Sequence, residues 1–218
     1  MLKTKIELVT GFIGAGKTAW INTLLEETYV NNEKIVILQL EKGEDELDPR
    51  LKQKTGAVYL MTIEKDLTQS YIGHLLLLYE PDRLIIECNG IKVLDEILAL
   101  LSDPKVRKRA IISTIFNVAE APAFKMYWNN LRPILMPALA LSNMILVTKT
   151  HLVSEQEKEE IRAILEKENA HGHIIFLEDL VDMQITMGEC PLLDKGWAKA
   201  LRVRIAGQLK ALRRGIKS

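Results

Sequence analysis

Residues 6–18 read Ile-Glu-Leu-Val-Thr-Gly-Phe-Ile-Gly-Ala-Gly-Lys-Thr, and they join a short apolar strand directly to a glycine-rich turn. Within them, Gly11, Gly16, Lys17 and Thr18 fit the pattern G-x-x-x-x-G-K-[ST], whose backbone N–H groups curl around a phosphate. The lysine neutralises phosphate oxygens, the hydroxyl is a ligand for Mg²⁺, and the following helix adds its positive end. A glycine-rich turn without nucleotide shares this pattern, but the strand before it and the helical sequence after it favour a phosphate-binding loop.

The residues expected to contact the phosphates belong to this turn and to the first turn of the helix. They are Gly11, Ile13, Gly14, Ala15, Gly16, Lys17, Thr18 and Ala19.

The composition is that of an ordinary globular protein. Of the 218 residues, 48% are hydrophobic, and 29 Lys plus Arg balance 29 Asp plus Glu. A net charge of zero gives no overall field that would attract nucleic acid or an anionic membrane. The chain has neither an apolar signal region at its start nor an apolar run of about 18 residues, so we expect a cytoplasmic protein without a membrane partner. Two cysteines, Cys88 and Cys190, argue against a disulfide framework.

Apolar, strand-like runs alternate with helical patterns along the whole chain. We expect strands at 6–9, 34–40, 56–61, 83–87, 110–118, 144–147 and 173–176. We expect helices at 18–30, 63–79, 92–101 and 154–169, and a helical stretch at 122–141 that is interrupted by Pro133 and Pro137. The continuous apolar runs are typical of strands buried on both faces. The pattern therefore predicts an α/β fold, a three-layer αβα P-loop NTPase whose mostly parallel sheet carries helices on both faces. The length favours a single domain over residues 1–218.

A carboxylate stands at the end of the strand expected at 83–87. Glu87 closes that strand, and a carboxylate at a strand tip beside a phosphate loop can hold Mg²⁺ directly or through water. The acidic stretch 41–49 follows another strand, at the edge of the sheet where open α/β folds bind ligands. Thr18 and Glu87 are therefore expected metal ligands, and Asp48 of the acidic stretch is counted as a third candidate ligand.

Three blocks occur in the order of a known family: Thr10–Thr18, Glu41–Asp48 and Leu84–Gly90. Together they resemble the CobW/HypB/UreG family of P-loop GTPases, most closely its CobW-like branch, over residues 5 to 178. The first block is close to that branch's T-G-F-L-G-A-G-K-T, and Glu87 and Gly90 match its E-[ST]-[ST]-G. The resemblance implies GTP and Mg²⁺ as ligands, slow hydrolysis, homodimers, and a switch that hands a metal or cofactor to a client metallo- or corrinoid enzyme.

Hydrolysis needs a water held in line with the γ-phosphate. The acidic stretch offers Glu41, Glu44 and Asp48, although such a run is also compatible with a merely solvated loop. Glu41 and Asp48 match an acid and an aspartate of the family pattern, so we take Lys17, Glu41 and Asp48 as the candidate catalytic residues. No arginine finger can be assigned, and we expect slow turnover.

The chain departs from the family pattern at two places. Where that branch carries G-C-x-C-C, this sequence reads Gly-Ala-Val-Tyr-Leu at 56–60, so we expect no soft-metal site there. The guanine-reading N-K-x-D corresponds to Thr148, Lys149 and His151. A neutral imidazole accepts one hydrogen bond where the aspartate accepts two, and one unpaired guanine donor costs about 1–3 kcal/mol. Guanine preference should be weakened, with ATP as the alternative nucleotide.

The last stretch, residues 193–218, reads as a basic amphipathic helix. Its apolar residues recur at intervals of three to four, and its other face carries lysine and arginine. We expect the apolar stripe to dock on the domain; the alternative is a basic surface for a membrane or partner.

Two alternatives to the GTPase switch stay open. A regulatory partner subunit that binds nucleotide without hydrolysing it would explain His151 and the missing thiols. A small-molecule kinase shares the same loop, although no arginine-rich lid lies between the strands.

Overall fold

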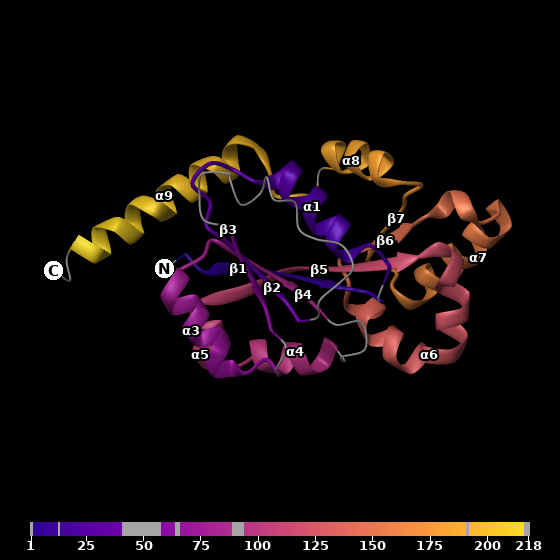
Figure 1. The fold of residues 1–218 in the computed structure, drawn as a ribbon, viewed down its shortest axis with the longest axis horizontal. Helices are drawn as coiled ribbons and strands as arrows, with labels where there is room; N and C mark the ends of the chain where they lie inside the picture. The colour runs from indigo at the N-terminus through magenta and orange to yellow at the C-terminus, as the bar shows by residue number, and fades with distance from the viewer. Residues whose placement is uncertain are drawn as a thin grey trace.

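The computed structural model describes residues 2–12, 14–40, 58–63, 66–88, 94–190 and 192–215. Of the residues expected in the site, Ile13, Glu41 and Asp48 lie outside these ranges. The described strands form one seven-stranded sheet in the order β3-β2-β4-β1-β5-β6-β7, and every neighbouring pair is parallel (Figure 1). The strands are β1 (Thr4–Thr10), β2 (Ile35–Gln39), β3 (Val58–Thr62), β4 (Arg83–Glu87), β5 (Ala110–Glu120), β6 (Met144–Thr148) and β7 (His173–Phe176).

Helices cover both faces of this sheet (Figure 1). One side carries α1 (Lys17–Thr28), α8 (Leu180–Glu189) and α9 (Gly196–Gly215). The other carries α3 (Gln69–Tyr79), α4 (Leu94–Leu101), α5 (Pro104–Arg107) and α6 (Ala121–Leu141), with α7 (Glu155–Glu168) packed on α6 at the far edge. Alternate residues of β2 supply the two cores, since Ile35 and Ile37 pack toward α1 whereas Val36 and Leu38 pack toward α3. The expected three-layer α/β fold is confirmed.

The sheet order places the phosphate loop at its centre. Strand β1 lies between β4 and β5, and the chain leaves it toward β2 on one side and returns through β4 to β5 on the other. A crevice at the carboxyl ends of such strands is where open α/β sheets bind ligands. The phosphate loop follows β1 directly, so it lies at the carboxyl end of this central strand.

One expected helix begins later than predicted, and another shows the interruption expected near Pro133. Helix α3 begins at Gln69 and not at residue 63, because Thr68 is its N-cap and its hydroxyl accepts a hydrogen bond from the Tyr71 N–H at 3.2 Å. Helix α6 runs across a kink at Leu131, whose φ is −128°. Pro133 explains the kink because its ring lacks an N–H and collides with the preceding turn.

Helices α5 and α8 were not expected from the sequence. Each is preceded by an aspartate whose carboxylate accepts a backbone N–H, Asp103 from Lys105 at 2.7 Å and Asp179 from Asp182 at 2.8 Å. Such caps satisfy the free N–H groups of a first turn. By contrast, α7 opens with the expected capping box of Ser154 and Glu157.

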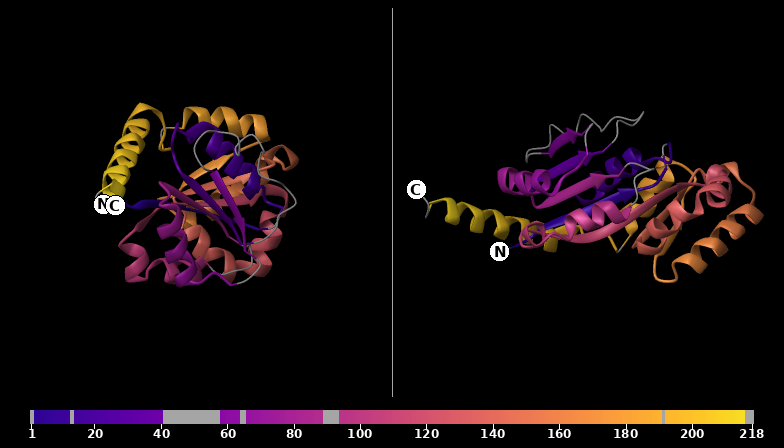
Figure 2. Two further views of the ribbon diagram at one scale, coloured as in Figure 1. Left: turned by 60° about the vertical axis from the view of Figure 1, so that its left-hand side comes forward. Right: turned by 90° about the horizontal axis from the view of Figure 1, so that it is seen from below.

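The final helix is turned opposite to our expectation. It begins at Gly196 and not at residue 193, and most of its large apolar side chains are exposed. Trp197 is 80% exposed, and the others are 44–64% exposed; we call this set the outer stripe, and it comprises Trp197, Leu201, Ile205, Leu209 and Leu212. Lys199 and Val203 are buried instead. The C-terminal half extends past the start of β1 (Figures 1 and 2).

No helix among the described residues is both long enough and apolar enough to cross a membrane.

Candidate phosphate-binding site

The glycines of the loop adopt backbone conformations that other residues rarely reach. Gly11, Gly14 and Gly16 have φ values of 138°, 78° and 93°. A Cβ added at Gly11 would lie 2.1 Å from the carbonyl oxygen of Val118 in β5, whereas Gly14 and Gly16 have open space. The first glycine therefore lets the turn press against the neighbouring strand, and the other two provide the left-handed turn that aims backbone N–H groups inward.

Lys17 closes the loop from inside. Its Nζ lies 3.0 Å from the carbonyl oxygens of both Gly11 and Phe12, and the residue is buried. Helix α1 begins here with Gly16 as N-cap and no side-chain capping bond. Its first N–H groups, together with the ammonium group, give the loop a concentrated positive potential. Ala15, in the loop before this helix, is buried, and Ala19, in its first turn, is half-buried.

The expected Mg²⁺ ligands of the described chain meet below the loop. The Thr18 hydroxyl donates to Glu87 Oε1 at 2.8 Å, and the Gln39 amide donates to Glu87 Oε2 at 2.7 Å. Glu87 is only 2% exposed. The two neutral partners hold both carboxylate oxygens in place while leaving further lone pairs on each. We call Thr18, Gln39 and Glu87 the carboxylate triad.

The donor set of this triad suits a hard divalent cation. Hydroxyl, carboxylate and amide oxygens are the ligands that Mg²⁺ prefers, usually together with waters and substrate phosphates. Across the ranges that the structure describes, no three His, Cys, Asp or Glu side chains gather closely enough to form a metal site of their own. The geometry thus favours a cation shared with a phosphate over a closed protein site.

The strand next to β5 brings the expected base-reading residues to the same edge. The Thr148 hydroxyl lies 3.1 Å from the Ala15 carbonyl oxygen and 3.3 Å from that of Ala119, so it ties β6 to the phosphate loop. Lys149 has a φ of 56°, and its Nζ pairs with Glu120 Oε1 at 3.0 Å. This lysine therefore already has a carboxylate partner beside the loop.

His151 lies in the short 3₁₀ helix η1 (Thr150–Leu152) and contacts the segment after β7. Its Nδ1 is 2.6 Å from the backbone carbonyl oxygen of Glu178. A carbonyl only accepts, so Nδ1 carries a hydrogen, and in the neutral tautomer with this arrangement Nε2 is the single acceptor. His151 is exposed, which leaves that acceptor accessible to a ligand.

Sequence reasoning missed three residues of this region: Gln39, Glu120 and Glu178. Gln39 ends β2 and Glu120 ends β5, so their position at the carboxyl edge of a parallel sheet was a signal that could have found them. Glu178 contributes a backbone atom, and no side-chain pattern reveals that contact.

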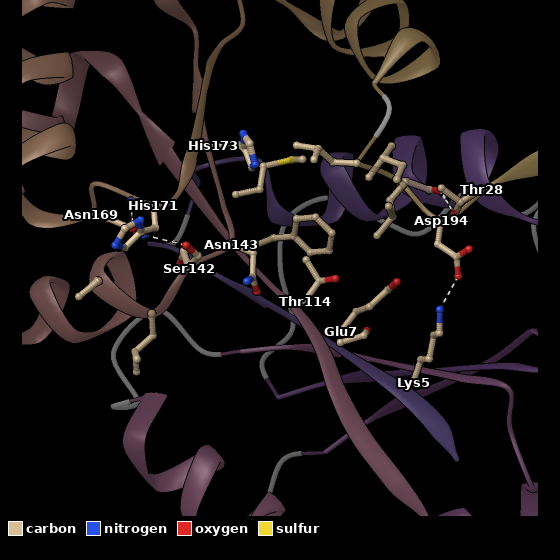
Figure 3. A pocket seen from close by; sticks show the side chains of 18 residues that line it. Lys5, Glu7, Thr28, Thr114, Ser142, Asn143, Asn169, His171, His173 and Asp194 are labelled. Atoms are coloured by element: carbon tan, nitrogen blue, oxygen red, sulfur yellow. Dashed lines mark hydrogen bonds and ion pairs between the residues drawn. The ribbon is translucent and has the colours of Figure 1, made fainter. Parts of the chain in front are cut away.

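A separate cavity of about 630 Å³ lies on the α1 side of the sheet, near the starts of β1, β6 and β7 (Figure 3). Two pairings occupy polar side chains on its wall. Lys5 Nζ pairs with Asp194 at 2.6 Å, and the Asn169 amide donates to the carbonyls of Leu139 and Ser142 at 2.7 Å each. Among the residues that the structure describes, its lining contains none from the phosphate loop.

Comparison with known proteins agrees with this geometry. The family model described as CobW/HypB/UreG, nucleotide-binding domain, matches residues 5–176. Two zinc chaperones of Escherichia coli K12 are similar in sequence. YjiA is 26% identical over 166 residues, which is 70% of this chain and 51% of YjiA; YeiR is 35% identical over 108 residues, 46% of this chain and 33% of YeiR. This chain therefore spans about half the length of the first relative and a third of the second.

Solved structures give the same picture. The Zn(II)-bound YjiA GTPase from E. coli superimposes with a TM-score of 0.61 at 26% identity, covering 80% of this chain and 57% of that one. The hydrogenase maturation factor HypB from Archaeoglobus fulgidus gives a TM-score of 0.55 at 19% identity, covering 79% and 80%. The second likeness shows a shared fold alone.

Proposed function

Since this chain belongs to the CobW/HypB/UreG family, we propose that it binds a nucleoside triphosphate, GTP before ATP, and hydrolyses it slowly as a conformational switch. The observation that carries this proposal is the carboxylate triad, because it puts Glu87 and the Thr18 hydroxyl 2.8 Å apart directly below the phosphate loop. In P-loop enzymes these two positions serve the divalent cation.

The chain's own residues supply most of the binding. Gly14 and Gly16 aim backbone N–H groups at the phosphates, and Lys17 exchanges its contacts with the carbonyls of Gly11 and Phe12 for phosphate oxygens. Thr18 and Glu87 would hold Mg²⁺, which neutralises charge on the β- and γ-phosphates. Glu41 and Asp48 remain the candidates for positioning the attacking water.

The base site supports a weaker preference for guanine than the family pattern implies. His151 offers one acceptor, Nε2, because its Nδ1 hydrogen is engaged by Glu178. One guanine N–H would then pair and the other would not, which reduces the discrimination between GTP and ATP.

The relatives named zinc chaperones suggest the process that the switch serves. We infer that nucleotide state here controls an encounter with a client metallo- or corrinoid enzyme during its maturation. The absence of cysteine from residues 56–60 argues against zinc carriage by thiolates at that position.

Isothermal titration with GTP and with ATP, each with Mg²⁺, tests the binding. We expect saturable binding that Lys17→Ala abolishes, because the variant loses the ammonium group that faces the phosphates. Lys158→Ala is the matched control, since Lys158 pairs with Glu155 on the surface of α7. No binding of either nucleotide at millimolar concentration would refute the switch.

The base is tested by competition between GTP and ATP on the wild type and on His151→Asp. The carboxylate restores a second acceptor, so we expect the GTP-to-ATP affinity ratio to rise about tenfold. An unchanged ratio would mean that His151 does not read the base.

A regulatory subunit that binds nucleotide without hydrolysing it is the second candidate, favoured by His151. Single-turnover phosphate release separates the two. Release that requires Mg²⁺ and is lost in Glu87→Gln supports the hydrolase, whereas binding without release supports the regulatory subunit.

A further inference from the structure

A small cavity of about 80 Å³ lies between α9 and the amino ends of β1 and β4. It shares Lys5 and Asp194 with the larger cavity of Figure 3, but its wall continues along α9 as far as Lys210. A water molecule occupies about 30 Å³ in the liquid, so this volume admits two or three waters or one small polyatomic ion. The phosphate loop lies at the opposite end of β1, so the two sites are separate.

The wall of this cavity carries more positive than negative charge. Three carboxylates line it, those of Glu33, Asp82 and Asp194. Six cationic side chains line it as well: Lys3, Lys5, Arg83, Lys199, Arg202 and Lys210. A fourth carboxylate, that of Glu7, pairs with Arg83 from outside the lining, so two positive charges among the described residues have no carboxylate of their own.

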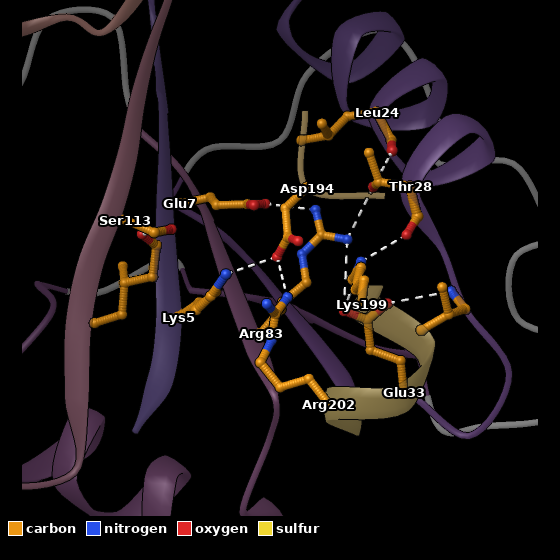
Figure 4. A network of polar contacts seen from close by, with 12 residues as sticks. Lys5, Glu7, Leu24, Thr28, Glu33, Arg83, Ser113, Asp194, Lys199 and Arg202 are labelled. Carbon is orange, nitrogen blue, oxygen red and sulfur yellow. Dashed lines mark hydrogen bonds and ion pairs between the residues drawn. The ribbon is translucent and has the colours of Figure 1, made fainter. Parts of the chain in front are cut away.

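The two uncompensated charges lie on one side of the cavity. Lys5 and Arg202 share a single carboxylate oxygen, Asp194 Oδ2 (Figure 4). Lys3 is exposed and forms no ion pair with any residue that the structure describes. By contrast, the two cations of the other side are paired one to one, Lys199 with Glu33 at 2.8 Å and Lys210 with Asp82 at 2.6 Å. The positive potential is therefore concentrated around Lys3, Lys5 and Arg202.

The wall also offers more hydrogen-bond donors than acceptors. Arg83 is 3% exposed, and its Nη1 and Nη2 groups donate to the Thr28 hydroxyl and to Glu7 (Figure 4). Its Nε is buried and has no hydrogen-bond partner among the described residues. A buried donor without an acceptor is costly, and such a group commonly marks the place of a water or an ion. Lysine and arginine side chains only donate, so a ligand here must bring acceptors.

A doubly charged tetrahedral oxyanion supplies both the negative charge and the acceptors. Phosphate groups carry close to two negative charges near neutral pH and several strong acceptor oxygens. A carboxylate brings one charge and two oxygens, and a metal cation would be repelled by the positive wall. Arginine and lysine are the side chains with which proteins commonly bind such oxyanions.

We propose that the cavity between α9 and the amino ends of β1 and β4 binds a doubly charged oxyanion, either a free ion or the end group of a phosphomonoester. Lys3, Lys5 and Arg202 supply the attracting charge, and Arg83 supplies a buried donor in the same wall. The site uses no residue of the phosphate loop. It can therefore exist whether or not the chain hydrolyses nucleotide, and either proposal can fail without the other.

Isothermal titration of Lys17→Ala with sulfate tests the site. This variant removes the ammonium group of the phosphate loop, which would itself attract oxyanions. Ionic strength is held constant with sodium chloride. We expect saturable binding of one sulfate per chain at millimolar concentration and a matching rise of the unfolding temperature. Neither saturable heat nor a rise in Tm would overturn the proposal.

Two variants of one ion pair provide a test that general loosening of α9 would not pass. Arg202→Gln removes an attracting charge, and together with Lys3→Gln it should weaken sulfate binding at least tenfold. Asp194→Asn removes a repelling carboxylate and should tighten sulfate binding several-fold. Both changes break the contact between Arg202 and Asp194. Effects in the same direction would therefore show that α9 has merely loosened, which overturns the site.

Lys167→Gln is the matched control, since Lys167 is an exposed lysine on α7, outside the cavity lining. It should leave sulfate binding unchanged, and a loss equal to that of Lys3→Gln would refute the site. The same variants can be compared in a chain that keeps Lys17, because they leave the phosphate loop intact. That comparison serves if Lys17→Ala does not fold.

Titrations with inorganic phosphate and with glycerol 3-phosphate distinguish the two sources of the oxyanion. Tighter binding of glycerol 3-phosphate assigns the cavity to a phosphomonoester end group, whereas tighter binding of inorganic phosphate assigns it to the free ion. In either case the binding should be lost in Lys3→Gln/Arg202→Gln. Binding that persists in this double variant would place the oxyanion elsewhere and overturn the proposal.

Discussion

Strand β4 begins and ends with a buried charged residue, and the two ends are neutralised in different ways. At its carboxyl end Glu87 is hydrogen-bonded by two neutral side chains, Thr18 and Gln39. At its amino end Arg83 is ion-paired, with its Nη2 2.6 Å from Glu7 Oε2 and its Nη1 3.8 Å from Glu33 Oε1. Both residues are at most 3% exposed.

The difference distinguishes a candidate cation-binding site at the carboxyl end of β4 from a structural ion-pair network at its amino end. Neutral partners orient a carboxylate without cancelling its charge, so Glu87 still attracts a cation. Arg83 is already compensated, and the carboxylates around it raise the pKa of its guanidinium, although burial alone would lower it. We therefore expect changes at the amino end to alter stability and changes at the carboxyl end to alter binding.

The largest effect should come from Glu33→Ala at the amino end. The variant leaves Lys199 and Arg83 without a shared, fully buried carboxylate, which should cost about 3–5 kcal/mol of unfolding free energy in urea titrations. Glu87→Gln should change stability by less than about 1 kcal/mol while abolishing Mg²⁺-dependent nucleotide binding. If both variants lose the same stability, the contrast between the two ends fails.

Gly11→Ala should have the next largest effect. The new Cβ would meet the Val118 carbonyl oxygen at 2.1 Å, and the positive φ adds strain, so we expect a loss of about 2–4 kcal/mol. Gly14→Ala has open space and a φ of 78°, and it should lose only about 1–2 kcal/mol. Thermal unfolding of both variants measures the difference. Equal losses of stability would contradict the close contact between Gly11 and the Val118 carbonyl oxygen.

Thr148→Val should weaken the tie between β6 and the phosphate loop. It removes the hydroxyl that contacts the Ala15 and Ala119 carbonyls, which should cost about 1–2 kcal/mol and reduce nucleotide affinity. Thr148→Ser keeps the hydroxyl and serves as the control in the same urea and binding titrations. A serine variant as weak as the valine variant would contradict a role for the hydroxyl.

The smallest effect on the unfolding free energy should appear at acidic pH and come from Asp194, which pairs with Lys5 and with Arg202 of α9. Burial raises the pKa of this carboxyl, but hydrogen bonds from Arg202 and Lys5 outweigh it and lower the pKa to about 2. Because the folded pKa lies below the unfolded one, the stabilisation is present above pH 4 and is lost as pH falls from 4 toward 2. After allowance for solvent exposure we expect about 1 kcal/mol. Urea titrations at pH 5 and pH 3 should show this slope in the wild type but not in Asp194→Asn.

Local sequence patterns predicted most of the residues at the carboxyl end of β4 and in the neighbouring phosphate loop. The spacing of Gly11, Gly16, Lys17 and Thr18 places them in one turn whatever the rest of the chain does, and Ser154 with Glu157 forms its capping box over three residues. Glu87 was identified because it ends an apolar strand. Gln39 was missed since its role depends on β2 lying next to β4, a pairing between residues 48 positions apart.

The amino end could not be predicted in this way. The partners of α9 lie far away in sequence, with Lys199 171 residues from Thr28 and Lys210 128 residues from Asp82. Periodicity correctly showed a helix with an apolar stripe, but it carries no information on which face meets the domain. The expectation that the apolar stripe of α9 packs on the domain was wrong. Instead, Lys199 pairs with Glu33 and Lys210 pairs with Asp82, which turns the basic face of α9 toward the domain.

The sequence by itself determined the succession of the seven strands along the chain, the phosphate loop and the acid at the end of β4, because these follow from patterns within a few residues. The tertiary structure alone decided that Gln39 joins Glu87, that Thr148 holds the loop, and that α9 turns its charges inward and its apolar stripe outward. Each of these outcomes depends on the free energy of pairing groups from distant segments, and that energy exists only once the sheet has brought them together.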